Sequence, residues 1–284
     1  MDINALIAAA FPELADIRPL AIRSGQKAVY SATLNGKKVA LKIVFQDDGR
    51  VDREIAAVAK LALPFVPRVL SHGERDVLGQ RRHFVIEEFI SGKNLRDVLN
   101  LRRRLDLEAV LPLTETLLKA CVEFERQKLV HRDIKPENLM LDDDGRIFVL
   151  DFGIVRMLEL PSLTSSDSKL GVFTAGYSAP EQFRNLKPQI DGRSDLFSVG
   201  VVVYEALSGS NPHVGGKANV LEILRHVETV DLAPLNIPGD GGAEFSEMLV
   251  SLTARFPSRR PRTAADALKW FGPIASRMRQ KKNA

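Results

Sequence analysis

The feature that most constrains this chain is a short polar loop near its middle, at residues 131–138. The loop reads His-Arg-Asp-Ile-Lys-Pro-Glu-Asn, and two short apolar runs follow it at 139–141 and 147–150. The second run ends directly before Asp-Phe-Gly at 151–153. Loops that carry chemistry are positioned by a rigid scaffold, so the patterns on either side of this block decide the fold.

The residues before the loop predict a small, mostly β region. Residues 1–16 have the apolar spacing of a short amphipathic helix. Two strand-like runs, 29–33 and 38–43, flank Asn35-Gly36, which is a strong hairpin signal. Further strand-like residues follow at 82–90. A helix is expected between these strands, at 50–61.

The residues from about 91 onward, on both sides of the loop, predict a larger, mostly helical region. Helical patterns precede the loop at 95–101 and 106–127 and resume after it at 195–207, 218–227, 243–254 and 263–271. The expected organisation is therefore an α+β chain with two lobes that share a cleft. Its parts are an N-terminal extension at 1–16, a β-rich lobe at 17–90, a helical lobe at 91–272 and a basic tail at 273–284, of which residues 277–284 are expected to be solvated.

Composition limits the class of protein and its partners. A chain of 284 residues is long for one compact domain and short for two independent ones. Its 40 basic and 36 acidic residues leave a weak positive charge, so no nucleic-acid partner is expected. Cys121 is the single cysteine and cannot form an internal disulfide. No signal peptide or membrane span is expected, which favours the cytoplasm.

The central loop carries the groups that phosphoryl transfer needs. That reaction uses a carboxylate to orient the attacking hydroxyl, a cation to neutralise phosphate, and oxygen ligands for Mg²⁺. Asp133, Lys135 and Asn138 supply one of each. Asp151 adds a second hard oxygen ligand, and one Asp with one Asn suits Mg²⁺, which keeps several of its waters.

Three motifs then occur in a fixed order. They are His-Arg-Asp with Asn five residues after the aspartate, Asp-Phe-Gly at 151–153 and Ala-Pro-Glu at 179–181. With this set the chain resembles the eukaryotic-type (Hanks-type) Ser/Thr protein kinases, especially compact bacterial members, over about 17–271. The resemblance implies a bilobal protein-kinase fold, ATP with Mg²⁺ or Mn²⁺, and a protein substrate with a serine or threonine acceptor.

The resemblance also assigns roles around the nucleotide. Asp133 would be the catalytic carboxylate with Lys135 beside it, and Asn138 and Asp151 would be metal ligands. Lys42 matches the lysine that holds the α and β phosphates. Further residues that the resemblance implies are Glu54 as the partner of that lysine, Glu88 and Ile90 for main-chain hydrogen bonds to adenine, and Val29, Ala40 and Met140 around its ring.

Several positions match parts of the family that support the site or receive the substrate. Thr174 matches the threonine whose hydroxyl bridges the catalytic Asp and Lys. Asp195 matches the aspartate that braces the catalytic loop, and Arg260 matches the partner of Glu181. His131 is expected to pack against Phe152. Loss of Lys42, Asp133, Asn138 or Asp151 would mark a pseudokinase, and all four residues are present.

Arg132 is expected to anchor a phosphorylated activation segment, because cations gather around phosphates. The candidate phosphorylation sites are Thr164, Ser165, Ser166 and Ser168. The alternative interpretation is that this stretch is merely a mobile polar loop. A separate regulatory protein or a homodimer is a candidate source of regulation.

The phosphate loop and the gatekeeper position depart from the family pattern, as does Phe173, which stands where a glycine commonly precedes the Thr-x-x-Tyr run. The glycine-rich loop would place glycines at 22, 24 and 27, yet Gly25 is the nearest glycine and is taken as the phosphate-loop contact. Lys27 or Gln26 is therefore expected to reach a phosphate through its side chain. Glu87 occupies the gatekeeper position, and a buried carboxylate there needs a partner.

Two other functions compete with a protein kinase. A pseudokinase would hold ATP as a scaffold without transferring phosphate, and only the glycine-poor loop favours it. A small-molecule kinase of the aminoglycoside or choline type would lack the segment 174–181, which this chain contains.

Overall fold

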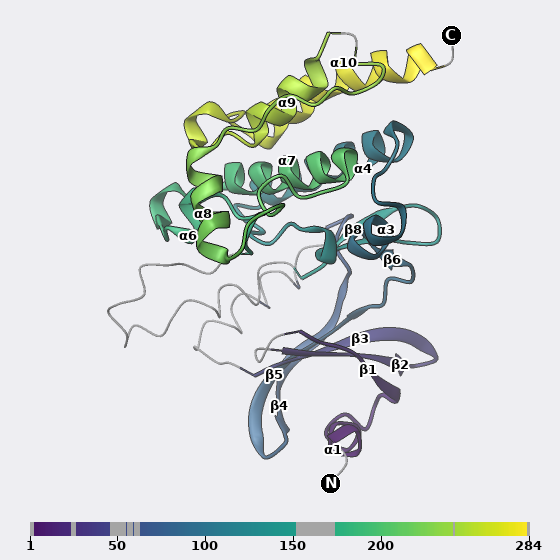
Figure 1. The fold of residues 1–284 in the computed structure, drawn as a ribbon. Helices are drawn as coiled ribbons and strands as arrows, with labels where there is room; N and C mark the ends of the chain where they lie inside the picture. Colours follow the sequence, from purple (N-terminus) through teal and green to yellow (C-terminus); the bar gives the residue numbers. More distant parts are fainter. Residues whose placement is uncertain are drawn as a thin grey trace. The chain divides into compact units, whose positions relative to one another are not determined.

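The computed structural model describes residues 3–23, 27–45, 55, 59, 63–151, 174–240 and 242–282. They fall into two compact units (Figure 1). The first unit is drawn from Met1–Ser91 together with a segment that begins at Leu150, and the second from Gly92–Val149 and the residues after that segment. The candidate phosphorylation sites and most of the helix expected at 50–61 lie outside the described residues.

The first unit is built on one antiparallel sheet with the strand order β1-β2-β3-β5-β4. Its strands are β1 Ala15–Arg23, β2 Lys27–Leu34, β3 Lys37–Val44, β4 Val69–Val77 and β5 Gln80–Glu88. The turn between β2 and β3 lies at Asn35 and Gly36, which have φ angles of 51° and 75°. Two successive left-handed residues match the twist of a hairpin, so the expected hairpin is confirmed.

One face of this sheet is apolar and is covered by helix α1, Ile3–Ala10. Alternate residues of β2, β3 and β5 point to this face because the side-chain period of a strand is two. Tyr30, Leu41 and Ile86 pack there in one core cluster with Ile7 of α1. Phe11, just after the helix, joins the same cluster. The N-terminal extension thus covers the apolar face of the sheet.

The opposite face carries charged residues. Register places Lys27 opposite Val44, Val29 opposite Lys42, and Ala40 opposite Glu87. Directly opposed residues point to the same face of a sheet. Lys27, Val29, Ala40, Lys42 and Glu87 therefore share one face, which holds the expected nucleotide contacts of β2 and β3.

The second unit is mostly helical. Its longer helices are α3 Leu95–Arg102, α4 Leu107–Arg126, α7 Gly192–Ser208, α8 Val220–Thr229, α9 Glu244–Leu252 and α10 Ala264–Lys282. Its shorter elements are β6 Lys93–Asn94, η1 Pro136–Asn138, β7 Leu139–Leu141, β8 Ile147–Val149, α6 Pro180–Phe183, η2 Lys187–Gln189 and η3 Pro257–Arg259. The α+β class expected from the sequence is confirmed.

Helix α7 is the centre of the second unit and packs against both α4 and α9 (Figure 1). Asp191 caps its first turn by accepting a hydrogen bond from the Arg193 N–H. Gly209, with φ 88°, ends it in the left-handed conformation typical of a helix C-terminus. Within the described residues no helix combines the length and apolar composition that crossing a bilayer requires.

The end of the chain differs from the expected solvated tail. Helix α10 continues to Lys282, with Pro273 inside it. Ile274 and Met278 are 2% and 7% exposed, and four residues apart they lie on one helix face. The many basic residues dominate the sequence pattern here, but this apolar pair keeps the helix packed against the unit.

Candidate functional site

Three polar side chains converge on the carboxylate of Asp133 in the second unit. Thr174 Oγ1 donates to Oδ1 at 2.8 Å, and Asn138 Nδ2 donates to Oδ2 at 2.8 Å. Lys135 Nζ lies 2.9 Å from Oδ2. It also donates to Thr174 Oγ1 at 3.1 Å, so the hydroxyl bridges the Asp and the Lys. The bridge that the resemblance implies is therefore present.

The local sequence explains how Asn138 comes back to Asp133. Pro136 starts the short helix η1, where its fixed φ suits the first helical position. This single turn brings Asn138 into a buried position, 1% exposed, from which Nδ2 also donates to the Asp133 carbonyl at 2.9 Å. The loop thus orients the Asn138 amide through two hydrogen bonds to one residue.

Asp195, in the first turn of α7, supports the loop at its other end. The N–H groups of His131 and Arg132 donate to its two oxygens at 2.7 and 2.8 Å. Arg132 has a φ of 67°, a conformation that costs energy for a non-glycine residue and needs such support. Burial raises the pKa of the Asp195 carboxyl to about 7, and the two N–H groups oppose that shift.

His131 is fully buried and stacks on the ring of Phe124, with ring centroids 5.8 Å apart. Its Nδ1 accepts a hydrogen bond from the Asp133 N–H at 3.2 Å. Through this second contact His131 holds the backbone of Asp133 in place from within the loop. The expected packing of His131 on Phe152 lies outside the described residues.

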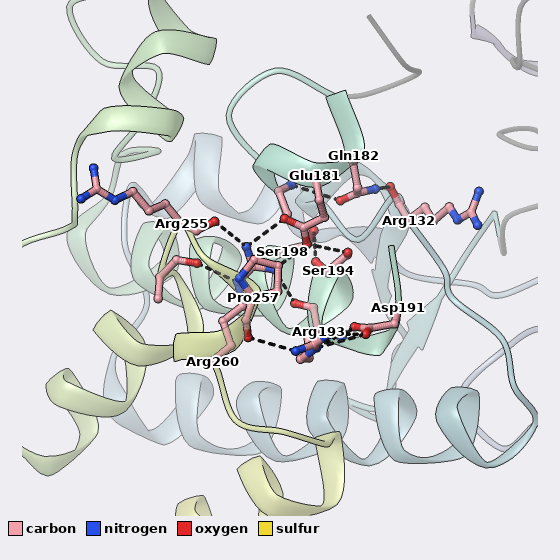
Figure 2. Close-up of polar contacts among 12 residues, drawn as sticks. Arg132, Glu181, Gln182, Asp191, Arg193, Ser194, Ser198, Arg255, Pro257 and Arg260 are labelled. Atoms are coloured by element: carbon pink, nitrogen blue, oxygen red, sulfur yellow. Dashed lines mark hydrogen bonds and ion pairs between the residues drawn. The ribbon is translucent and has the colours of Figure 1, made fainter. Parts of the chain in front are cut away.

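The Ala-Pro-Glu motif is held by a buried ion pair (Figure 2). Glu181 accepts two hydrogen bonds from Arg260, at 2.6 and 3.1 Å, and one from Ser194 Oγ at 2.7 Å. The side chains of Glu181 and Arg260 are 1% and 0% exposed. The next residue, Gln182, donates from Nε2 to the Arg132 carbonyl at 2.9 Å. The motif is therefore tied directly to the loop of Asp133.

The first unit contains a charge cluster made of Lys27, Lys42, Glu87 and Asp151. Lys42 Nζ lies 2.5 Å from Glu87 Oε1 and 3.0 Å from Asp151 Oδ1. Lys27 Nζ lies 2.8 Å from the other oxygen, Asp151 Oδ2. All four side chains are 7–13% exposed. Two ammonium groups therefore share one carboxylate on the charged face of the sheet.

Burial and pairing pull the pKa values of this cluster in opposite directions. Burial alone raises the pKa of Asp151, but Lys42 and Lys27 outweigh it and hold that pKa well below its usual range. Burial raises the pKa of Glu87, with Lys42 opposing the shift. Burial lowers the pKa of Lys27, whereas two carboxylates outweigh burial at Lys42 and raise its pKa.

Glu87 thus has a buried partner that sequence reasoning did not identify. Glu87 lies opposite Ala40, and Lys42 is two residues along the same strand on the same face. Long side chains can reach diagonal neighbours in a sheet, so the register between β3 and β5 would have predicted the pairing of Lys42 with Glu87. The partner that the resemblance implies for Lys42, Glu54, lies outside the described residues, as does Gly25.

The other expected nucleotide contacts are spread over both units. Val29 and Ala40 share a sheet face with Lys42. Glu88 ends β5, and its N–H donates to the Arg68 carbonyl at 2.9 Å. The remaining expected positions are Ile90, which is buried in the first unit, and Met140, which lies in β7 of the second unit.

Replacing Glu87 by glutamine should lower the free energy of opening of β3 and β5 by about 2 kcal/mol, because Lys42 loses one of its two buried carboxylates. Hydrogen exchange of the amides in these strands measures that free energy. Glu88→Gln is the matched control, since Glu88 is the exposed neighbour on the opposite face. Equal exchange in the two variants would show that the Lys42–Glu87 pair adds nothing.

Comparison with known proteins gives a consistent family. The sequence model described as the protein kinase domain matches residues 24–270. A probable serine/threonine-protein kinase of Streptomyces coelicolor is 31% identical over 258 residues, 88% of this chain. The serine/threonine-protein kinase PknL of Mycobacterium tuberculosis is 37% identical over 207 residues, 73% of this chain. A probable PknB of Bifidobacterium longum is 34% identical over 232 residues, 76% of this chain.

These relatives are longer proteins. The matched region covers 38% of the Streptomyces protein, 50% of PknL and 33% of the Bifidobacterium protein. The chain therefore spans half or less of the length of each of these relatives.

Proposed function

The chain belongs to the protein kinase domain family, and from that premise we propose that it is a serine/threonine kinase that transfers the γ-phosphate of ATP to protein hydroxyl groups. The observation that carries the proposal is the convergence of Thr174, Lys135 and Asn138 on Asp133. A carboxylate held in this way can orient a substrate hydroxyl and accept its proton. Lys135 supplies positive charge beside it for the transferred phosphoryl group.

The residues present fit ATP and a divalent cation. Asp151 offers a carboxylate and Asn138 an amide oxygen, which are the hard oxygen donors that Mg²⁺ prefers and Mn²⁺ accepts. The cation supplies neutralisation of phosphate charge when it is bound. In this proposal Lys42 binds the α and β phosphates, with Glu54 as a further partner of its ammonium group, and Gly25 contributes backbone to the phosphate loop.

The proposed adenine contacts are apolar side chains and main-chain groups. Val29 and Ala40 lie on the same face of the sheet as Lys42. The full proposed set is completed by Met140 and by the main-chain groups of Glu88 and Ile90. A flat base held by apolar contacts and a few backbone hydrogen bonds is the usual pattern of a small-molecule site.

The test is transfer of label from γ-labelled ATP and Mg²⁺ to a basic protein, followed by identification of the labelled amino acids. Wild type should yield phosphoserine and phosphothreonine, and Lys42→Met should yield at most a hundredth of that label. Binding of ATP without any transfer would instead support the ATP-binding scaffold. Transfer to an aminoglycoside or choline, with none to protein, would support a small-molecule kinase.

We also propose how the enzyme is regulated and where it is located. Arg132 follows His131 in the catalytic loop, and we propose that it binds a phosphate on the activation segment. A regulatory protein or a second copy of the chain would then control that phosphorylation. Cys121 is buried as a free thiol, which is compatible with the proposed cytoplasmic location.

A further inference from the structure

We propose that Lys27 is a second phosphate-binding cation of the nucleotide site, a role that rests on the proposed kinase function. Lys27 is the first residue of β2 and is 6% exposed. It shares the charged face of the sheet with Lys42, and both ammonium groups contact the same carboxylate, Asp151. The charge cluster therefore brings two cations, not one, to the residue that is proposed to hold the metal ion.

The position of Lys27 fits this role. It stands where the family pattern would place the last glycine of the phosphate loop. A glycine there lets the backbone approach the phosphate closely. A lysine cannot supply that approach as glycine does, but it can deliver an ammonium group through its flexible side chain. Charge from a side chain thus takes the place of hydrogen bonds from the backbone.

The partners of the two lysines differ in a way that makes Lys27 the more available cation. Lys42 contacts both Glu87 and Asp151. Within the described residues, the ion pair found for Lys27 is with Asp151 alone. If the Asp151 oxygens held a metal ion, Lys42 would keep the carboxylate of Glu87. Lys27 would lose its contact with the carboxylate of Asp151.

A buried ammonium group without an anion is strongly unfavourable, so Lys27 must find another negative group. The phosphates of the nucleotide are the anions that arrive together with the metal ion. Lys27 would therefore exchange a carboxylate for a phosphate oxygen on binding. Without nucleotide, the same residue offsets the charge of Asp151, and among the described residues of this charge cluster two ammonium groups face two carboxylates.

The test compares binding of Mg·ATP and of adenosine to Lys27→Met by isothermal titration calorimetry. The affinity for Mg·ATP should fall about tenfold, because one charge-assisted contact to phosphate is lost. The affinity for adenosine, which has no phosphate, should change by less than about twofold. Lys37→Met is the matched control, since Lys37 is an exposed lysine at the start of β3 and should bind both ligands like wild type.

Lys27→Arg keeps the charge and should retain most of the Mg·ATP affinity. This variant also keeps the inference testable if Lys27→Met does not fold. The inference is overturned if Lys27→Met binds Mg·ATP as tightly as wild type, if it loses adenosine affinity equally, or if Lys27→Arg binds Mg·ATP no better than Lys27→Met. If wild type itself binds no Mg·ATP, the proposed kinase function fails instead. Binding by wild type therefore distinguishes failure of the kinase proposal from failure of the inference about Lys27.

Discussion

Replacing Asp133 by asparagine should lower kcat for phosphate transfer about 1,000-fold and leave the affinity for Mg·ATP within about threefold of wild type. Asparagine has nearly the shape of aspartate, but it cannot accept the proton of a substrate hydroxyl. It also removes the negative charge that Lys135 and Thr174 contact at 2.9 and 2.8 Å. Steady-state kinetics and calorimetric titration with Mg·ATP measure the two quantities separately.

Two further variants sharpen this prediction. Asp143→Asn changes an exposed aspartate in the turn between β7 and β8, and its kcat should equal that of wild type. Thr174→Val removes the bridging hydroxyl but keeps the carboxylate, so it should lower kcat about tenfold. An Asp133→Asn variant that keeps more than a tenth of wild-type kcat would show that Asp133 is not the base.

The features that residue patterns alone predicted correctly are local ones, whereas the contacts of Thr174 with Asp133 and of Arg260 with Glu181 were expected only from the family resemblance. The hairpin depends on Asn35 and Gly36, two adjacent residues that adopt left-handed conformations readily. The turn at Pro136, which the sequence patterns did not predict, is local too, because the fixed φ of proline starts η1 and this turn brings Asn138 back to Asp133. Each of these follows from a few neighbouring residues, so no knowledge of distant packing is needed.

The features that were missed depend on residues far apart in the sequence. The pairing of Lys42 with Glu87 requires the register between β3 and β5, which no short window contains. The contact of Lys27 with Asp151 joins the start of β2 to a residue that follows β8. The sequence indicates that a buried charge needs a partner of opposite charge. Which of several charged residues becomes that partner depends on the strand register of the folded sheet.

The continuation of α10 was missed for a different reason. Residues 273–284 are rich in Arg and Lys, and their charge outweighs the two apolar residues that anchor them. Ile274 and Met278 are buried on one helix face, while Arg277 and Arg279 are exposed. A short amphipathic turn at a chain end gives too few residues for its period to stand out.

The second unit holds the loop of Asp133 through two supports of different kinds. Asp195 binds two backbone N–H groups of the loop directly. Gln182 binds the carbonyl of Arg132, and its neighbour Glu181 is fixed by the ion pair with Arg260 (Figure 2). Arg260 lies far along the sequence from the loop. Loss of the ion pair should nevertheless lower the stability of the second unit and shift the position of α6.

Replacing Arg260 by methionine should lower the free energy of unfolding of the second unit by about 3 kcal/mol. The loss leaves the carboxylate of Glu181 fully buried with Ser194 as a remaining hydrogen-bond donor. Arg260 also donates to the carbonyls of Ala254 and Arg193, so those acceptors lose a partner too. Urea unfolding followed by fluorescence of Trp270, the single tryptophan, reports on this unit.

The matched control is Arg126→Met, which breaks an ion pair of similar length, 2.8 Å, between residues 67% and 27% exposed. Exposed pairs contribute little, so this variant should lose less than about 1 kcal/mol. Adding Glu181→Leu to Arg260→Met removes the orphaned carboxylate and should recover at least about 1 kcal/mol, because charge burial and not lost volume causes most of the effect. If Arg260→Met loses no more stability than Arg126→Met, or if the double variant is less stable than Arg260→Met, the pair is not what holds the Ala-Pro-Glu segment in place.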